Sequence, residues 1–156
     1  MKYTLSVLVE NQPGVLSKVV GLFSRRGYNL DSGAVGAPED STMSCVTIVG
    51  EGDDYILEQV EKQLNKVIPV IKVRSLSPGA VRAELMLIKT GCETQHLAEI
   101  NQIAALMKAE VVDVAKGSVT LRFAGEQEKC DTLCALLRPY GIREIARTGV
   151  IALDRG

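Results

Sequence analysis

The order of strand-like and helix-like patterns occurs twice in this chain, once in each half. In strand patterns apolar and polar residues alternate, whereas in helix patterns apolar residues recur three or four positions apart. Residues 1–76 show the order strand, helix, strand, strand, helix, strand, and residues 83–156 show it again. This βαββαβ order is typical of a ferredoxin-like unit, an antiparallel sheet with two helices on one face. We therefore predict an α+β chain of two tandem ferredoxin-like units, joined by a short linker at residues 77–82.

Each of the six elements expected in the first half has its own signal. Alternation over Tyr3–Val9 predicts a strand, and the apolar residues from Val15 to Phe23 predict a helix that ends at Gly27. Turn residues separate two further strands, and Pro69 ends the second helix before a last strand. The predicted elements are Tyr3–Val9, Val15–Arg26, Tyr28–Val35, Met43–Val49, Ile56–Val67 and Val70–Val73.

The second half repeats these signals. Around the second helix of each half, four positions align at a constant offset: Gly52, Leu57, Val60 and Leu64 with Gly125, Cys130, Leu133 and Leu137. Such self-similarity indicates a duplicated unit, or two units of one fold. A unit of roughly 70 residues with helices on one face leaves the other face and two sheet edges uncovered. We therefore expect a homodimer, paired through the first units by a sheet edge or a helix face.

The turn between the first strand and the first helix, Glu10–Leu16, is a candidate binding site. Asn11 can cap the helix, Pro13 suits its first turn, and Gly14 allows close approach to the backbone. Unpaired N–H groups at a helix N-terminus bind carboxylates and phosphates. Turns of this kind are also common in proteins that bind nothing there, so the turn alone leaves both interpretations open.

A free amino acid could bind at this turn through both of its charged groups. Its carboxylate would accept hydrogen bonds from the N–H groups of Gly14, Val15 and Leu16, while the amides of Asn11 and Asn29 would bind its ammonium and carboxylate. Asn29 begins the strand after the same helix, so we expect it at a dimer boundary, facing a neighbour's turn. Micromolar affinity for a branched ligand of about eight heavy atoms needs roughly 1 kcal/mol per atom, so the site must be preorganised.

Composition argues against several classes of protein. The net charge is −1 and the charged residues are interspersed, which does not suggest a nucleic-acid-binding or membrane-binding surface. The sequence has no long apolar run and no signal-peptide pattern. We expect a cytoplasmic protein with no nucleic-acid or membrane partner.

No metal site, cofactor site or catalytic group is expected in this chain. His96 is the single histidine, and we expect its side chain to be solvated at the surface. The cysteines form no CxxC pair and fit small core positions: Cys45, Cys92, Cys130 and Cys134. The glycines form neither GxGxxG nor a P-loop. Small ferredoxin-like proteins can hydrolyse acyl phosphates with an arginine and an asparagine, but Asn11–Leu16 contains no arginine.

Five segments resemble one family, the acetolactate synthase small, regulatory subunits, whose first domain is an ACT domain. The first two segments match its ACT domain, and the last three are not general ACT features. The segments are Leu5–Leu16, Gly21–Ser32, Leu57–Lys66, Glu84–Lys89 and Glu144–Gly149. The resemblance implies an ACT domain at residues 1–76, a linker at 77–82 and a C-terminal ferredoxin-like domain at 83–156.

The resemblance also implies a function and a set of effector-binding residues. It implies a non-catalytic subunit that activates a large catalytic subunit and confers feedback inhibition when valine, a branched-chain amino acid, binds between paired ACT domains. Thiamine diphosphate, magnesium and FAD are then expected on the catalytic subunit alone. The effector-binding positions that carry over are Asn11, Gly14, Val15, Leu16, Asn29 and Leu30.

Three features depart from the family pattern. Gly33 stands where a bulky apolar residue is usual, the segment 43–46 has no arginine, and the helix that begins near Glu93 is atypical. Two alternatives stay open on the sequence. One alternative to the regulatory subunit is a stand-alone ACT amino-acid sensor that acts on another partner. The other is an assembly subunit whose pocket no longer binds an effector.

Overall fold

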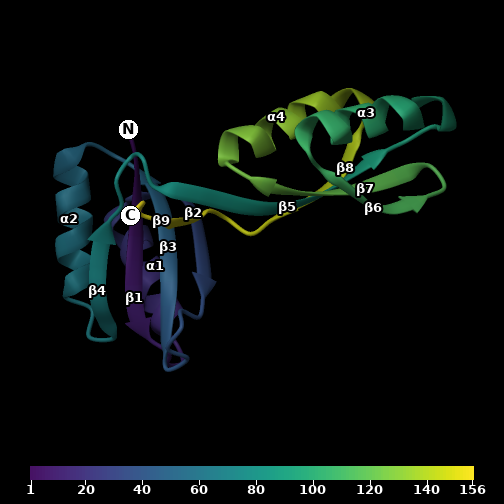
Figure 1. Ribbon diagram of the computed structural model, residues 1–156. Coiled ribbons are helices and arrows are strands. Elements are labelled where there is room, and N and C mark those ends of the chain that lie inside the picture. Colours follow the sequence, from purple (N-terminus) through teal and green to yellow (C-terminus); the bar gives the residue numbers. More distant parts are fainter. The chain divides into compact units, whose positions relative to one another are not determined.

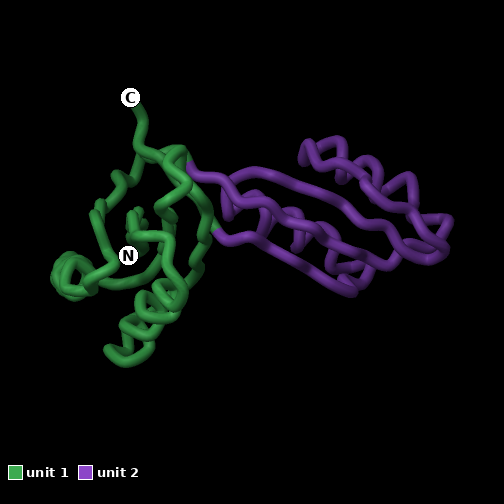
Figure 2. Tube along the Cα trace, turned by 90° about the horizontal axis from the view of Figure 1, so that it is seen from below, with its two compact units in different colours: residues 1–81, 150–156 green, residues 82–149 purple.

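A computed structural model describes all 156 residues of the chain (Figure 1). The chain forms two compact units, residues 1–81 together with 150–156, and residues 82–149 (Figure 2). Each unit contains an antiparallel sheet and two α-helices in the order βαββαβ. The predicted α+β architecture of two ferredoxin-like units is confirmed.

The four-stranded sheet of the first unit has the strand order β2-β3-β1-β4, so β2 and β4 are its edges. Both helices pack against the same face, because the alternating residues of β1 share one core with residues of α1 and α2. The elements are β1 (Lys2–Glu10), α1 (Val15–Arg26), β2 (Asn29–Gly36), β3 (Met43–Glu51), α2 (Asp54–Asn65) and β4 (Val70–Ser75).

The core of the first unit follows the two periodicities seen in the sequence. Tyr3, Leu5, Val7 and Val9 of β1 point to the helices and are at most 6% exposed. Burying an aliphatic side chain such as Leu5, Val7 or Val9 contributes roughly 1.5–3 kcal/mol to folding. The helices and β3 supply the remaining buried members: Val15, Val19, Leu22, Phe23, Val46, Ile48, Val60 and Leu64.

The predicted end of α1 is confirmed. Gly27 adopts the left-handed conformation with φ 67°, and the N–H of Tyr28 donates to the carbonyl of Phe23 at 3.0 Å. A glycine after the last turn is the usual way to satisfy the final carbonyls of a helix. This end of α1 therefore leads directly into β2.

The second unit repeats the arrangement, with the corresponding strand order β6-β7-β5-β8. Its core includes Cys130, Leu133 and Leu137, which are fully buried and align with Leu57, Val60 and Leu64 of the first unit. The elements are β5 (Val81–Gly91), a short 3-10 turn η1 (Thr94–His96), α3 (Leu97–Met107), β6 (Glu110–Ala115), β7 (Ser118–Gly125), α4 (Gln127–Leu137), η2 (Arg138–Tyr140) and β8 (Ile142–Arg147).

The boundaries of the units differ from the expected 77–82 linker and 83–156 domain. Strand β5 begins at Val81, and residues 150–156, which include β9 (Ile151–Leu153), belong to the first unit. Asp154 accepts hydrogen bonds from the N–H and the hydroxyl of Ser77 at 3.0 and 3.1 Å, and Arg155 donates to the carbonyl of Gly79. These are contacts between residues far apart in sequence, and periodicity carries no signal for them.

Candidate functional site

The candidate site begins at the turn before α1, where Gly14 is the N-cap residue. Gly14 has φ 82° and ψ −2°, a left-handed conformation that favours glycine, and no side chain caps the helix. The expected capping role of Asn11 is wrong for this structure. Asn11 lies three residues before the cap with an exposed side chain, and its N–H donates to the carbonyl of Thr42 at 3.0 Å.

Two of the three predicted N–H donors remain available at this helix end. The N–H of Val15 donates to the carbonyl of Gln12 at 3.4 Å, which turns that amide inward. The N–H groups of Gly14, Leu16 and Ser17 donate no hydrogen bond to the protein. Ser17 was missed by the sequence reasoning, although any residue in the first turn has such an amide.

The electrostatics of this helix end favour an anion. Among the four α-helices, α1 has no acidic residue in its first turn, whereas the other three have one each: Asp54, Glu99 and Glu128. The positive end of the α1 dipole therefore has no carboxylate of its own, and a carboxylate of a ligand would be stabilised there.

The structure places Asn29 at the opposite end of the sheet from Asn11. Asn29 pairs with Glu51 in the register of β2 and β3, while Glu10, next to Asn11, pairs with Met43 at the far end of β3. One chain therefore does not bring the two amides together. The side-chain amide of Asn29 donates to the carboxylate of Glu51 at 3.5 Å, so an acid lies beside it that sequence reasoning did not select.

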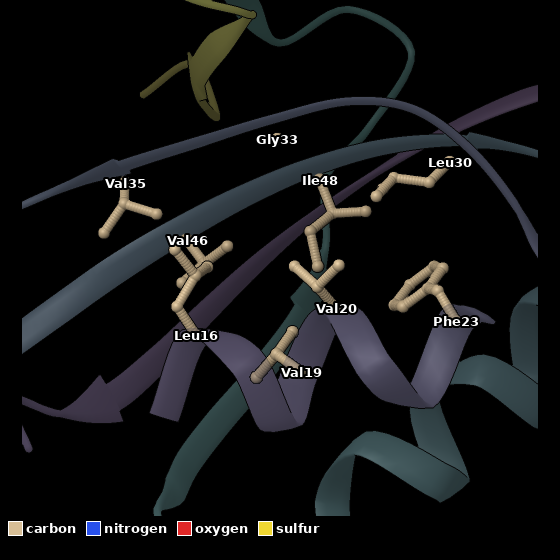
Figure 3. A pocket seen from close by; sticks show the side chains of 9 residues that line it. All are labelled: Leu16, Val19, Val20, Phe23, Leu30, Gly33, Val35, Val46 and Ile48. Carbon is tan, nitrogen blue, oxygen red and sulfur yellow. The ribbon is translucent and has the colours of Figure 1, made fainter. Parts of the chain in front are cut away.

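An apolar groove runs along α1 beneath strand β2 (Figure 3). Its volume is about 190 Å³, and every residue that lines it is apolar. Leu16 and Leu30, both predicted site residues, belong to the lining, whereas the others were not predicted. The lining residues are Leu16, Val19, Val20, Phe23, Leu30, Gly33, Val35, Val46 and Ile48.

The groove has a buried floor and exposed walls. Val46 and Ile48 are 2% exposed, whereas Leu16, Val20 and Val35 are 43–51% exposed. Half-exposed aliphatic side chains gathered along one groove are typical of a surface that binds an apolar group or another chain. The groove and the helix end share Leu16, so a carboxylate and an apolar side chain could be bound together.

No cluster of three or more histidine, cysteine, aspartate or glutamate residues could hold a metal ion, and no helix is long and apolar enough to cross a membrane. Burial raises the pKa of the Cys130 and Cys134 thiols, which keeps them protonated. His96 lies in η1, and its ring packs edge-on against Tyr140.

Two family models match the chain, one for each half. Residues 5–72 match an ACT domain described as AHAS small subunit-like, and residues 83–156 match the model described as small subunit of acetolactate synthase. The chain is also 46% identical to the probable acetolactate synthase small subunit of Archaeoglobus fulgidus, over 100% of this chain and 98% of that protein. This chain belongs to the acetolactate synthase small-subunit family.

Further acetolactate synthase small subunits agree with this assignment. The identity is 49% with the protein of Mycolicibacterium smegmatis, covering 99% of this chain and 91% of the relative. It is 42% with the isozyme 3 small subunit of Salmonella typhimurium, covering 100% and 97%. The crystal structure of the small subunit from Thermotoga maritima superimposes with a TM-score of 0.94 at 35% identity, over 100% and 98% of the two chains.

The family assignment confirms the ACT domain that the sequence predicted for the first unit. The second family model covers residues 83–156, the range predicted for the C-terminal domain, although residues 150–156 fold with the first unit. The six predicted effector-binding residues stay a prediction, and the structure adds Ser17 and the groove beside α1 to them.

Proposed function

We propose that this small subunit binds a branched-chain amino acid at the start of α1 and thereby regulates a separate catalytic subunit in the cytoplasm. The small subunit activates the catalytic subunit, and bound valine inhibits the assembly as feedback control. The chemistry belongs to the catalytic subunit, which uses thiamine diphosphate. Magnesium and FAD are also assigned to that subunit, and this chain carries no cofactor.

The observation that carries the proposal is the free helix end beside the apolar groove. The ligand's carboxylate accepts from the N–H groups of Gly14 and Leu16, because the Val15 amide is already bonded to Gln12. The ligand's side chain lies in the groove from Leu16 onwards. Val15 then acts by fixing the turn rather than by donating a hydrogen bond to the ligand.

A second copy of the chain completes the site. Strand β2 is an edge of the sheet, and α1 exposes Leu16 and Val20 beside it. A dimer that joins these surfaces buries exposed apolar area and brings the partner subunit's Asn29 to the turn, which one chain alone does not do. Glu51 lies beside Asn29, so the same dimer brings the carboxylate of the partner subunit's Glu51 to the turn, where it can bind the ligand's ammonium group.

Regulation then requires that the ligand stabilise one arrangement of the paired ACT domains. A coupling free energy of roughly 1–3 kcal/mol between effector and catalytic subunit corresponds to a change of about 5–150-fold in affinity. The ligand exerts this coupling only through contacts that differ between the two arrangements. A site shared by two chains provides such contacts.

The test is an activity assay of the catalytic subunit reconstituted with this chain. Gly14→Asp places a carboxylate where the ligand's carboxylate would bind. We therefore expect the valine concentration for half inhibition to rise at least about tenfold, while activation of the catalytic subunit persists. Asn29→Ala should have the same effect. Gly117→Asp is a matched control, since Gly117 also has a left-handed φ of 83° and open space around it, in the turn between β6 and β7.

Unchanged valine inhibition in Gly14→Asp would rule out this site. Calorimetry of the unmodified chain with valine, leucine and isoleucine gives an independent measurement of binding. If none of the three produces heat, and none inhibits the reconstituted enzyme, the effector role itself is wrong.

A further inference from the structure

The groove beside α1 has a gap in its outer wall at Gly33. In the register of β2 with β3, the residues of β2 that face α1 are Leu30, Gly33 and Val35. Figure 3 shows Gly33 between Val35 and Leu30 on β2, and the register pairs Gly33 with Ile48 of β3. The two neighbours supply side chains to this wall, whereas Gly33 supplies none.

Nothing within the chain requires a glycine at this position. Gly33 does not have a left-handed φ, and a Cβ added there would have no heavy atom within 4 Å. At Gly50, in contrast, the Tyr3 ring and the Asn29 carbonyl occupy the place of a side chain. A glycine in the interior of a strand is destabilising and often marks a place where a ligand or another backbone approaches.

We propose that the space at Gly33 is a subsite for the outer end of the effector's side chain, so that this chain prefers leucine or isoleucine to valine. This inference rests on the proposed effector role, in which valine is one effector, and adds the order of preference among the branched-chain amino acids. Leucine and isoleucine carry one methylene more than valine. The groove is lined by apolar residues alone, so charged and polar amino acids are excluded from it.

The spacing along α1 supports this assignment. Leu16 carries one of the free amides, and Val20 lies one helical turn further on, about 6 Å along the axis, in the same groove lining as Gly33. A ligand held at the amides would place a valine side chain beside Leu16 and Val35. A side chain that is one bond longer reaches towards the open space at Gly33.

Calorimetry of the full-length chain with valine, leucine and isoleucine tests the preference. We expect leucine or isoleucine to bind about four-fold tighter than valine, the ratio that corresponds to one more buried methylene. Gly33→Leu fills the subsite, so leucine and isoleucine should weaken at least about tenfold while valine changes less than about twofold. Gly33→Ala should give an intermediate result if the larger substitution prevents folding.

Gly36→Leu is the matched control. Gly36 lies on the same strand, points to the opposite face by the alternation of β2, and also has open space around it. The control should leave the order of affinities unchanged. Circular dichroism and sedimentation of both variants report folding and dimerisation.

Three results would overturn the subsite. The first is valine binding to the unmodified chain as tightly as leucine and isoleucine, which leaves the effector role intact. The second is a Gly33→Leu chain with an unchanged ratio of affinities. The third is a Gly33→Leu chain with an altered dimer equilibrium and unchanged ligand preference, which would show that a second copy occupies the space. Absence of heat with all three amino acids, together with no inhibition of the reconstituted enzyme by any of them, would overturn the effector role as well.

Discussion

Arg147 binds a carboxylate that has almost no contact with water. The side chain of Glu84 in β5 is 4% exposed, and both of its oxygens accept hydrogen bonds from Arg147 of β8, at 2.6 and 3.0 Å. A third bond, at 2.9 Å, joins Arg147 to Asp131 of α4. The hydrogen bonds that Arg147 donates to Glu84 raise the pKa of its guanidinium, so Arg147 stays charged and joins two strands and a helix.

Replacing Arg147 with methionine should therefore destabilise the second unit strongly. The Glu84 carboxylate would stay buried without its partner, which we expect to lower the free energy of unfolding by about 3 kcal/mol. Lys89→Met is the control, because Lys89 forms an exposed ion pair with Glu144 across the same two strands and should cost less than about 1 kcal/mol. Urea denaturation followed by circular dichroism measures both, and equal losses would contradict this role of Arg147.

At the scale of residues, the sequence predicted which residues lie at the helix end better than it predicted how they are arranged. The choice of Gly14 and Leu16 followed from local turn chemistry, and both lie at the free helix end. The cap assigned to Asn11 failed because Gly14 takes the cap position with its left-handed backbone. The groove residues Val20 and Val35 could not be found, because they meet only once α1 is placed beside β2.

At the scale of elements, the two helices of the first unit begin in different ways. α2 begins with Asp53 as its N-cap, whose carboxylate accepts from the N–H of Ile56 at 2.9 Å. α1 begins at Gly14 with neither a capping side chain nor an acid in its first turn. One helix start is therefore capped by a side chain of its own chain, and the other is not.

Asp53→Ala should lower the free energy of unfolding of the first unit by about 1 kcal/mol, because the capping bond to Ile56 is lost. Asp54→Ala removes the same charge from the first turn without removing that bond, and should have the smaller effect. Thermal unfolding of both variants provides the comparison. A larger loss in Asp54→Ala would show that charge, and not capping, stabilises this helix end.

Element types were predictable throughout because helix and strand periodicities are local. The predicted first helix, Val15–Arg26, has the observed bounds, and the predicted strands of the first unit differ from the observed ones by a few residues at their ends. The helix end marked by Gly27 was predicted from its chemistry. The start near His96 was less regular, because a 3-10 turn precedes α3.

At the scale of the whole molecule, the second unit is inserted into the first. The chain leaves the first unit after Val81 and returns to it at Val150. The returning segment is fixed by a small apolar cluster of Leu76, Ala80 and Ala152, and by the bonds of Ser77 to Asp154. The first unit is therefore closed by residues from both ends of the chain, an arrangement that sequence patterns cannot reveal.

Asp154→Ala should release this returning segment without unfolding either core. Both bonds from Ser77 end on one carboxylate oxygen, and hydrogen bonds to a charged group contribute roughly 1.5–3 kcal/mol, so the amides of 151–156 should exchange at least about tenfold faster. Asp154→Asn keeps an acceptor oxygen at this place and should show a smaller increase. Hydrogen–deuterium exchange with mass spectrometry measures the segment directly, with the amides of β1 and β7 as internal references, because β5 itself pairs with β9. If exchange in 151–156 is unchanged in Asp154→Ala, the segment is held by its other contacts, which are the apolar cluster, the pairing of β9 with β5 and the bond from Arg155 to Gly79. If β1 and β7 exchange faster as well, the segment is part of a larger cooperative unit, and its release should then lower the unfolding temperature of the whole chain.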